Sequence, residues 1–282
     1  MKFQLKALAA ALALVAAVPA QAAINSANSG NGSLVLTVFD AANNISALFD
    51  LGLNYSDFNV SSNNFAVSNA LSANYAWNLT ANGLNNGIQG DYATAWSNFA
   101  ATANEAGASW AVIASDNLGA PGVGNFGFIS TIANSTVAKA NLNSNQLVAI
   151  GSTLTIYTDD AGAANVQNHS TALNGASVSL VSTPGYFLPF YTADKNNNTG
   201  AIAIGAINSS LDVIQRTSGS GALVQSSQLV FANNGVNAKF NLTSAGQLSY
   251  TTAAAPIPEA DTWAMMLLGL GFMGFIARRK QA

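Results

Sequence analysis

The chain has 282 residues, of which only 7% are charged and none is cysteine. The lack of cysteine excludes disulfide bonds and thiolate chemistry. Between residues 23 and 252 there are four basic and ten acidic side chains, a net charge of about −6. Such a surface has no basic patch with which to neutralise phosphates, so we expect no nucleic acid partner.

The first 22 residues have the organisation of a secretory signal peptide. Lys2 and Lys6 precede an apolar stretch over residues 7–18, and Ala20 and Ala22 form an A-x-A cleavage pattern. This order of a basic, an apolar and a small-residue region is typical of a segment that is removed after export. We therefore predict an exported protein with a signal peptide at 1–22 and a mature chain that begins at residue 23.

Residues 23–252 alternate short apolar runs with turns rich in Asn, Gly and Ser. Leu34, Leu36 and Val38 alternate with their neighbours and, with the returning run from Ile45, predict a β-hairpin over residues 33–50. Short strands at intervals of about 8–12 residues predict a mainly β body, an antiparallel β-sandwich with a jelly-roll-like arrangement. The other expected strands are 73–80, 110–115, 128–132, 146–150, 153–158, 177–182, 201–207, 211–216, 229–232, 238–243 and 247–251.

One segment, residues 91–105, has the pattern of an amphipathic helix. Its first residue, an aspartate, is a preferred helix cap, and the glycine at 107 is a common helix end. Tyr92, Trp96 and Phe99 recur at helical spacing, so their rings lie on one face. We expect this face to pack on a sheet rather than to bind a ligand.

Candidate catalytic groups are few. His169 is the only histidine, and no G-x-S-x-G motif precedes it. Asp159 and Asp160 are the only adjacent acids, and they suit a hard cation only if they lie at a turn. A glycosidase needs two facing carboxylates about 5–9 Å apart, and the sequence spacing favours no pair. The acids considered for such a pair are Asp40, Asp50, Asp57, Glu105 and Asp116.

From these observations we expect a body that is not an enzyme and that needs no cofactor. One segment, D-K-N-N-N-T-G from Asp194 to Gly200, imitates a calcium loop because oxygen donors recur at alternate positions. The glycine comes one position late, and Gly205 stands where such a loop has a bidentate glutamate. An Asn-rich turn needs no metal, so no metal site is predicted, with calcium at this turn left as an open alternative.

Residues 253–282 form a separate unit with three parts. Pro258 and Glu259 make a stiff, polar start, Trp263 to Ala277 is an unbroken apolar run, and three cations end it. As a helix the run is about 22 Å long, which is short for the ~30 Å hydrocarbon core of a bilayer. We predict a single transmembrane helix over about 262–278. Cations remain cytoplasmic, so the Pro-Glu pair lies outside the membrane.

This arrangement resembles the PEP-CTERM sorting signal of exopolysaccharide-producing Gram-negative bacteria. The family signature is Pro-Glu-Pro, and Ala260 stands at its third position. The resemblance implies recognition by a membrane-embedded protease, the exosortase, which cuts near the motif. The resemblance rests on Pro258-Glu259, on the run from Thr262 to Gly269 and on the basic end of the tail. It implies a sorting and cleavage motif at Pro258, Glu259 and Ala260, a membrane anchor that includes Trp263, Leu267, Leu268, Gly271 and Phe275, and a cytoplasmic basic stop at Arg278, Arg279 and Lys280.

Three functions follow from these features as hypotheses. The first is a structural or adhesive component of an exopolysaccharide or biofilm matrix, with exosortase and membrane lipid as partners of the tail and exopolysaccharide or like proteins as partners of the body. The second is a carbohydrate-binding module that stacks sugars on Trp77, Trp110 or Tyr186. The third is a glycoside hydrolase or another secreted enzyme. Exposed aromatic rings on one sheet face favour the second, and two carboxylates across a cleft favour the third.

Overall fold

The computed structural model describes residues 24–58, 74–81, 83–85, 88–90, 92–118, 125–133, 142–161, 175–183, 185–196, 202–233 and 235–252. The chain divides into two units, Met1–Thr252 and Ala253–Ala282, and every described residue belongs to the first. The predicted signal peptide and transmembrane helix lie outside the described residues. Among the residues that are described, no helix has the length and apolar character needed to cross a membrane.

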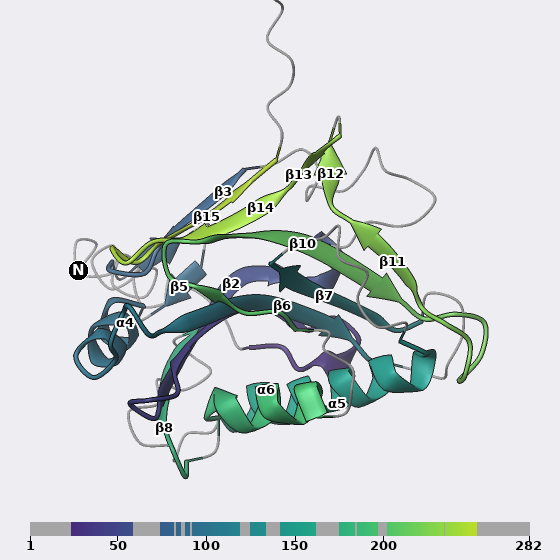
Figure 1. Ribbon diagram of the computed structural model, residues 1–282, viewed down its shortest axis with the longest axis horizontal. Coiled ribbons are helices and arrows are strands. Elements are labelled where there is room, and N and C mark those ends of the chain that lie inside the picture. Colours follow the sequence, from purple (N-terminus) through teal and green to yellow (C-terminus); the bar gives the residue numbers. More distant parts are fainter. Residues whose placement is uncertain are drawn as a thin grey trace, which may run out of the picture. The chain divides into compact units, whose positions relative to one another are not determined.

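The body is built on one sheet of eleven antiparallel strands (Figure 1). Its main path runs through β3 (Tyr75–Asn78), β15 (Gln247–Thr251), β14 (Lys239–Leu242), β10 (Ser210–Thr217), β7 (Gly127–Ile132), β6 (Ser109–Asp116), β1 (Ser33–Asp40), β2 (Ile45–Asn54) and β8 (Ala176–Leu180). Beside this path, β11 (Ser227–Val230) pairs with β10, and β9 (Gly205–Ala206) pairs with β6. Two small sheets join β4 (Gly83–Asn85) to β5 (Ile88–Gly90) and β12 (Ala232–Asn233) to β13 (Val236–Asn237).

The helices in the described residues are η1 (Ala27–Ser29), α2 (Tyr55–Phe58), α4 (Tyr92–Ala100), α5 (Ser144–Ala161) and α6 (Phe187–Asn196). Figure 1 shows α5 and α6 side by side beneath one face of the sheet. The predicted hairpin over 33–50 is confirmed, and β2 continues it to Asn54. The predicted helix is also confirmed, although it ends at Ala100 instead of 105.

Both faces of the central strands are buried. Successive side chains of a strand point to opposite faces, and in β1 Leu34 and Leu36 enter the larger hydrophobic core while Val35 and Phe39 enter a second one. Every residue of β1 is consequently buried. A sheet that is covered on both sides shows this pattern.

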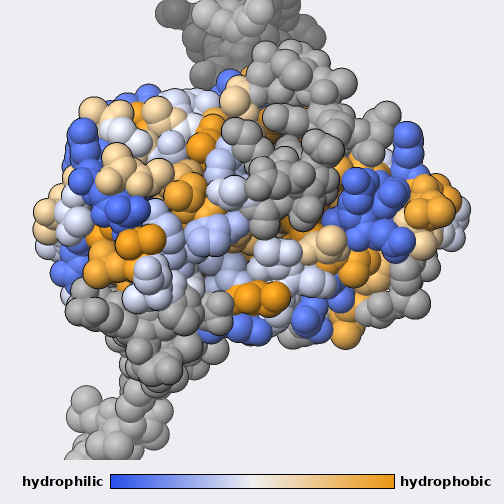
Figure 2. Space-filling view, turned by 60° about the horizontal axis from the view of Figure 1, so that its bottom comes forward, coloured by the Kyte–Doolittle hydropathy of each residue, from blue (hydrophilic) through white to orange (hydrophobic). Residues whose placement is uncertain are grey.

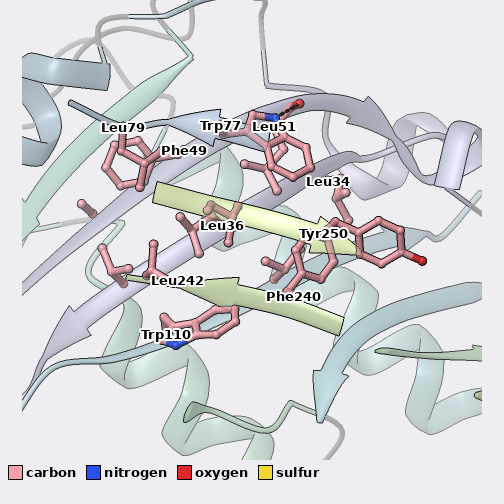
Figure 3. Packing of buried hydrophobic residues seen from close by; sticks show 14 of the residues in the cluster. Leu34, Leu36, Phe49, Leu51, Trp77, Leu79, Trp110, Phe240, Leu242 and Tyr250 are labelled. Carbon is pink, nitrogen blue, oxygen red and sulfur yellow. Dashed lines mark hydrogen bonds between the residues drawn. The ribbon is translucent and has the colours of Figure 1, made fainter. Parts of the chain in front are cut away.

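The sheet curves back on itself as a half-barrel. The larger core lies on its concave face. The indole Nε1 of Trp77 in β3 donates to the carbonyl of Leu51 in β2 at 2.8 Å, although the sheet path separates these strands widely. Phe58 fills the space between, with its ring centroid 4.8 Å from that of Tyr250 and 5.8 Å from that of Phe240. Figure 3 shows the bond between Trp77 and Leu51 and the rings of Phe240 and Tyr250 in this core. The predicted mainly β, antiparallel body is therefore confirmed. Its arrangement differs from the expected sandwich of two packed sheets, since one curved sheet covers its own concave face.

The convex face is covered by α5 and α6. The buried apolar side chains of α5 are Leu147, Ile150, Leu154 and Tyr157, which recur at helical spacing. The two strands predicted at 146–150 and 153–158 are therefore wrong, because this segment is one helix. The glycine between them, Gly151, does not form a turn. A Cβ there would lie 2.9 Å from side-chain atoms of both Asn117 and Ser115, so it permits close approach of α5 to β6.

The start of α5 is fixed by a reciprocal capping pair. The Asn143 side chain accepts from the backbone N–H of Gln146 at 3.0 Å, and the Gln146 side chain accepts from the backbone N–H of Asn143 at 2.9 Å. Such a pair satisfies donors that a helix start otherwise leaves unpaired. In α6, Pro189 is the third residue, inside the first turn, where proline costs no helical hydrogen bond.

Candidate functional site

The two tryptophans proposed as sugar-stacking residues are core residues. Trp77 is 1% exposed and Trp110 is 0% exposed. Besides the bond of Trp77 to Leu51, the Trp110 indole donates to the carbonyl of Ala206 at 2.9 Å. Neither ring is available to a ligand, so Trp77 and Trp110 are excluded as sugar-stacking residues.

Tyr186 borders a surface hollow at the turn between β8 and α6. Its hydroxyl oxygen is buried and has no hydrogen-bond partner among the described residues. Burial raises the pKa of Tyr186, and the charge of Asp40 raises it further, so the phenol remains a neutral donor. The hollow measures about 560 Å³ and is lined by Val181, Ser182, Thr183, Tyr186, Leu188, Pro189 and Thr192. On the face that carries α5 and α6, apolar and polar residues are interspersed (Figure 2).

Asp40 closes the turn between β1 and β2. One carboxylate oxygen accepts from the backbone N–H groups of Ala42 and Asn43, at 2.9 and 3.2 Å. The other accepts from the Asn43 amide and from the N–H of Asn104, both at 2.7 Å. Desolvation raises the pKa of Asp40, but these four hydrogen bonds outweigh it and hold the pKa below its ordinary value. Asp40 is therefore an ionised structural residue.

Asp50 lies in β2 and is 2% exposed. Its oxygens accept from the N–H of Gly52 at 2.8 Å and from the hydroxyl of Ser33 at 3.1 Å. Burial raises the pKa of Asp50 to about 6, against the opposing effect of these two bonds. The fold thus holds a carboxyl that gains and loses its proton in mildly acidic solution.

The remaining acids are distributed over separate turns and strands. Asp57 accepts from the N–H of Asn54 at 3.0 Å, Asp116 accepts from the N–H of Leu118 at 3.2 Å, and Glu105 is exposed in the turn after α4. Asp57 and Asp116 each accept from a backbone N–H that is two or three residues away in the sequence. The contacts of the described acids give no pair of carboxylates facing across a cleft.

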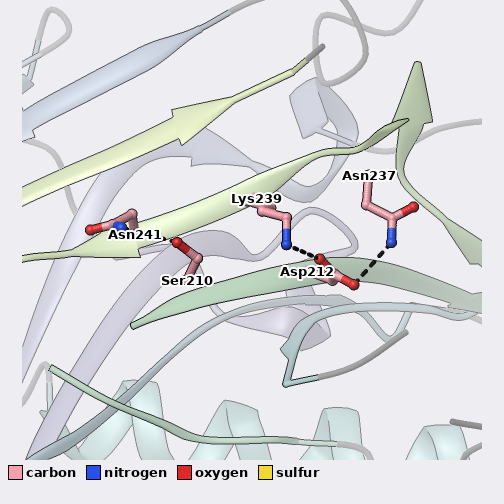
Figure 4. A network of polar contacts seen from close by, with 5 residues as sticks. All are labelled: Ser210, Asp212, Asn237, Lys239 and Asn241. Atoms are coloured by element: carbon pink, nitrogen blue, oxygen red, sulfur yellow. Dashed lines mark hydrogen bonds and ion pairs between the residues drawn. The ribbon is translucent and has the colours of Figure 1, made fainter. Parts of the chain in front are cut away.

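Two rungs between β10 and β14 carry a polar network (Figure 4). Asp212 contacts the Lys239 ammonium at 3.2 Å and accepts from the Asn237 amide at 2.9 Å. Two rungs along, the Asn241 amide donates to the hydroxyl of Ser210 at 3.0 Å. These contacts join adjacent strands, which indicates a structural role.

The other candidate residues are placed as follows. Asp159 and Asp160 lie on α5, not at a turn, and Asp194 lies near the end of α6. His169 and Gly200 lie outside the described residues. Within the described ranges, no group of three His, Cys, Asp or Glu residues is arranged to hold a metal ion.

The sorting signal is supported by comparison with known proteins. The family model of the PEP-CTERM protein-sorting motif matches residues 256–280. The match supports an exported protein whose C-terminal segment is a sorting signal. In particular, the chain is a PEP-CTERM sorting domain protein, an exosortase substrate. No curated protein and no solved structure matches the chain.

The matched range contains the predicted motif residues Pro258, Glu259 and Ala260 and the basic residues Arg278, Arg279 and Lys280. These residues lie outside the described part of the chain. Within the body, sequence analysis missed the burial of Asp50. The only signal for it was its place in a strand whose neighbours on both sides are apolar.

Proposed function

We propose that the chain is delivered to the cell surface or extracellular matrix, where its body is a structural or adhesive component of an exopolysaccharide matrix. The observation that carries this proposal is the sorting motif at residues 256–280. Hydrogen bonds within the body support it: the indoles of Trp77 and Trp110 and the carboxylates of Asp40 and Asp50 bond to groups of the chain itself, which is a structural use of these side chains.

Cleavage near Pro258 and Glu259 would release the body from its membrane segment. The apolar run is short for a stable anchor, but it is long enough to hold the Pro-Glu element at the outer interface while a protease acts. Glu259 is a charge that does not enter lipid cheaply, and Pro258 keeps the element out of the helix. The proposal is that this cleavage removes Trp263 to Ala282.

Intact-mass analysis of the exported protein tests this step. Glu259→Gln should slow processing, whereas the matched change Asp261→Asn two residues away should leave it unchanged. Replacing Arg278, Arg279 and Lys280 with neutral residues should let uncleaved protein be secreted, because the inner end is no longer held. If most surface molecules of the wild type retain residues 278–282, the tail is a plain membrane anchor and the proposed processing is wrong.

A second function, carbohydrate binding, is favoured by one observation. The hollow beside the buried Tyr186 combines the ring of Pro189 with the hydroxyls of Ser182, Thr183 and Thr192. Titration with soluble fragments of the host's exopolysaccharide is the test. Thr192→Val, which removes an exposed hydroxyl of the lining, should weaken binding about fivefold, the equivalent of one hydrogen bond, while Tyr75→Phe should not. Equal affinities of the three proteins exclude this site.

We further propose that the body has no enzymatic activity. The described carboxylates hold turns and strands, and His169 is the one histidine in the chain. Turnover of a polysaccharide, ester or peptide substrate that disappears in His169→Ala would overturn this.

A further inference from the structure

Strand β11 forms a free edge of the large sheet. Among the strands that the structure describes, it pairs with β10 alone, in the register Ile214 to Val230 through Thr217 to Ser227. Figure 1 shows it at the rim of the sheet, leading from β12 down to a loop. An edge strand presents a row of unpaired backbone donors and acceptors that another strand can bond.

The register fixes which backbone groups of β11 point outward. The N–H of Phe231 donates to the carbonyl of Val213 at 2.9 Å, so Phe231 points toward β10. Antiparallel pairs alternate between bonded and non-bonded positions, so Ser227 and Leu229 also point toward β10. The N–H and C=O groups of Gln228 and Val230 therefore point away from it, and in the described part of the chain no strand pairs with them.

The chain before β11 independently supports this assignment of outward-pointing backbone groups. The N–H of Ser226, two residues before Gln228, donates to the carbonyl of Leu142 at 2.7 Å. The outer edge of the chain is thus bonded at Ser226, by the segment that leads into α5. At Gln228 and Val230, no other described strand bonds this outer edge.

This edge has none of the usual protection against pairing. Natural edge strands are guarded by charges, proline or bulges, yet residues 217–238 contain no charged residue and no proline. Exposed apolar side chains stand beyond both ends of the strand. Leu223 is 80% and Val224 45% exposed before β11, and Val236 is 54% exposed in the hairpin that follows it.

We propose that a second copy of this chain pairs with β11 across a twofold axis through Leu229. Gln228 of each copy then bonds Val230 of the other, which gives four backbone hydrogen bonds. Leu229 meets its own counterpart as a non-hydrogen-bonded pair. The large sheets of the two copies then form one continuous sheet. This pairing would extend the structural role proposed for the body, but it does not depend on that role.

A second copy is favoured over an unrelated partner because the edge is complementary to itself. Antiparallel pairing about Leu229 places the Leu223–Val224 end of one copy toward the β12–β13 end of the other, so exposed apolar residues are present at both junctions. The absence of charge between residues 217 and 238 removes the repulsion that identical charged edges would feel. An edge without charges also offers nothing that would attract a charged partner in preference to a second copy.

Cysteine cross-linking of the full chain tests the register, because the natural chain has no cysteine. Leu229→Cys should give a disulfide-linked dimer under mild oxidation, since the two sulfurs meet at a non-hydrogen-bonded pair, where side chains are closest. Thr251→Cys, exposed on β15, is the control and should cross-link only by random collision. If the two variants cross-link at equal rates, the proposal is wrong.

Gln228→Pro separates pairing from folding. Its N–H points away from β10, so proline removes no bond within the body, but it removes two of the four bonds across the twofold axis. Dimer formation should weaken about tenfold or more, measured by sedimentation of the cysteine-free chain in detergent and by loss of the cross-link when Gln228→Pro is combined with Leu229→Cys. Thermal unfolding should match that of the wild type. A folded Gln228→Pro variant that still dimerises like the wild type overturns the proposal.

Discussion

The two faces of the curved sheet are covered in different ways. On the concave side the cover is the sheet itself, and aromatic rings fill the space between its two ends. On the convex side two helices form the cover, and hydroxyl groups are mixed with the apolar contacts, as where Thr37 of β1 bonds Tyr157 of α5. Hydrogen bonds occur on both sides, as between Trp77 and Leu51 on the concave side. The two covers therefore differ in what packs against the sheet, which is the sheet's own strands on one side and helices on the other.

The largest effect is expected from Phe58→Ala on the concave side. Phe58 is fully buried and touches the rings of Tyr75, Phe231, Phe240 and Tyr250, so its loss leaves a cavity that rigid strands cannot close. The free energy of unfolding should fall by about 3–5 kcal/mol, measured by denaturant unfolding.

The matched change on the convex side is Leu154→Ala in α5. A helix can shift toward a cavity more readily than a bonded strand, so the loss should be nearer about 2–3 kcal/mol. A larger loss for Leu154→Ala than for Phe58→Ala would contradict the proposed difference between the two faces.

Asp50→Asn probes the pH dependence of β2. Below about pH 4 the carboxyl is protonated in both folded and unfolded chains. As pH rises to about 6, the unfolded chain loses this proton first, because burial raises the pKa of folded Asp50. Stability therefore falls over this window by up to about 3 kcal/mol. The variant should gain that amount relative to the wild type between pH 4 and 7.5, and a constant difference would exclude the raised pKa.

The smallest effect is expected from Tyr157→Phe, which removes the bond of 2.9 Å to Thr37 on the convex side. The counterpart on the concave side is Tyr55→Phe, which removes the bond of 2.8 Å from the Gln215 amide. Each change should cost about 1–2 kcal/mol, because the remaining partner stays buried. Differential scanning calorimetry of both variants compares the two covers, and no change in either would show that water replaces the lost partner.

The sequence predicted the concave side better than the convex side. Alternation in β1 and the aromatic spacing of α4 follow from local patterns, and both elements are found where predicted. The segment of α5 has many β-branched residues around Gly151 and was predicted as two strands. The spacing of Leu147, Ile150 and Leu154 was the contrary signal, and burial against the sheet outweighs the local β preference.

The candidate sites differ in the same way. The sorting tail was predictable because a short contiguous motif defines it, and the match at 256–280 confirms it. The buried Asp50, the hollow at Tyr186 and the open edge of β11 depend on pairing between distant segments. One strand register determines which groups of β11 face outward, and no pattern within residues 227–230 contains that information.

The chain leaves the body from β15, which is bonded to β14 on one side and to β3 on the other. Chain ends commonly fray, and a fraying strand exposes its neighbours to proteases. Here the last described residue, Thr252, also donates its N–H to the Asn74 side chain at 3.0 Å. Opening this end requires the loss of bonds to two strands at once, so a cut in the following tail does not free β15, and the body keeps its fold when the tail is removed.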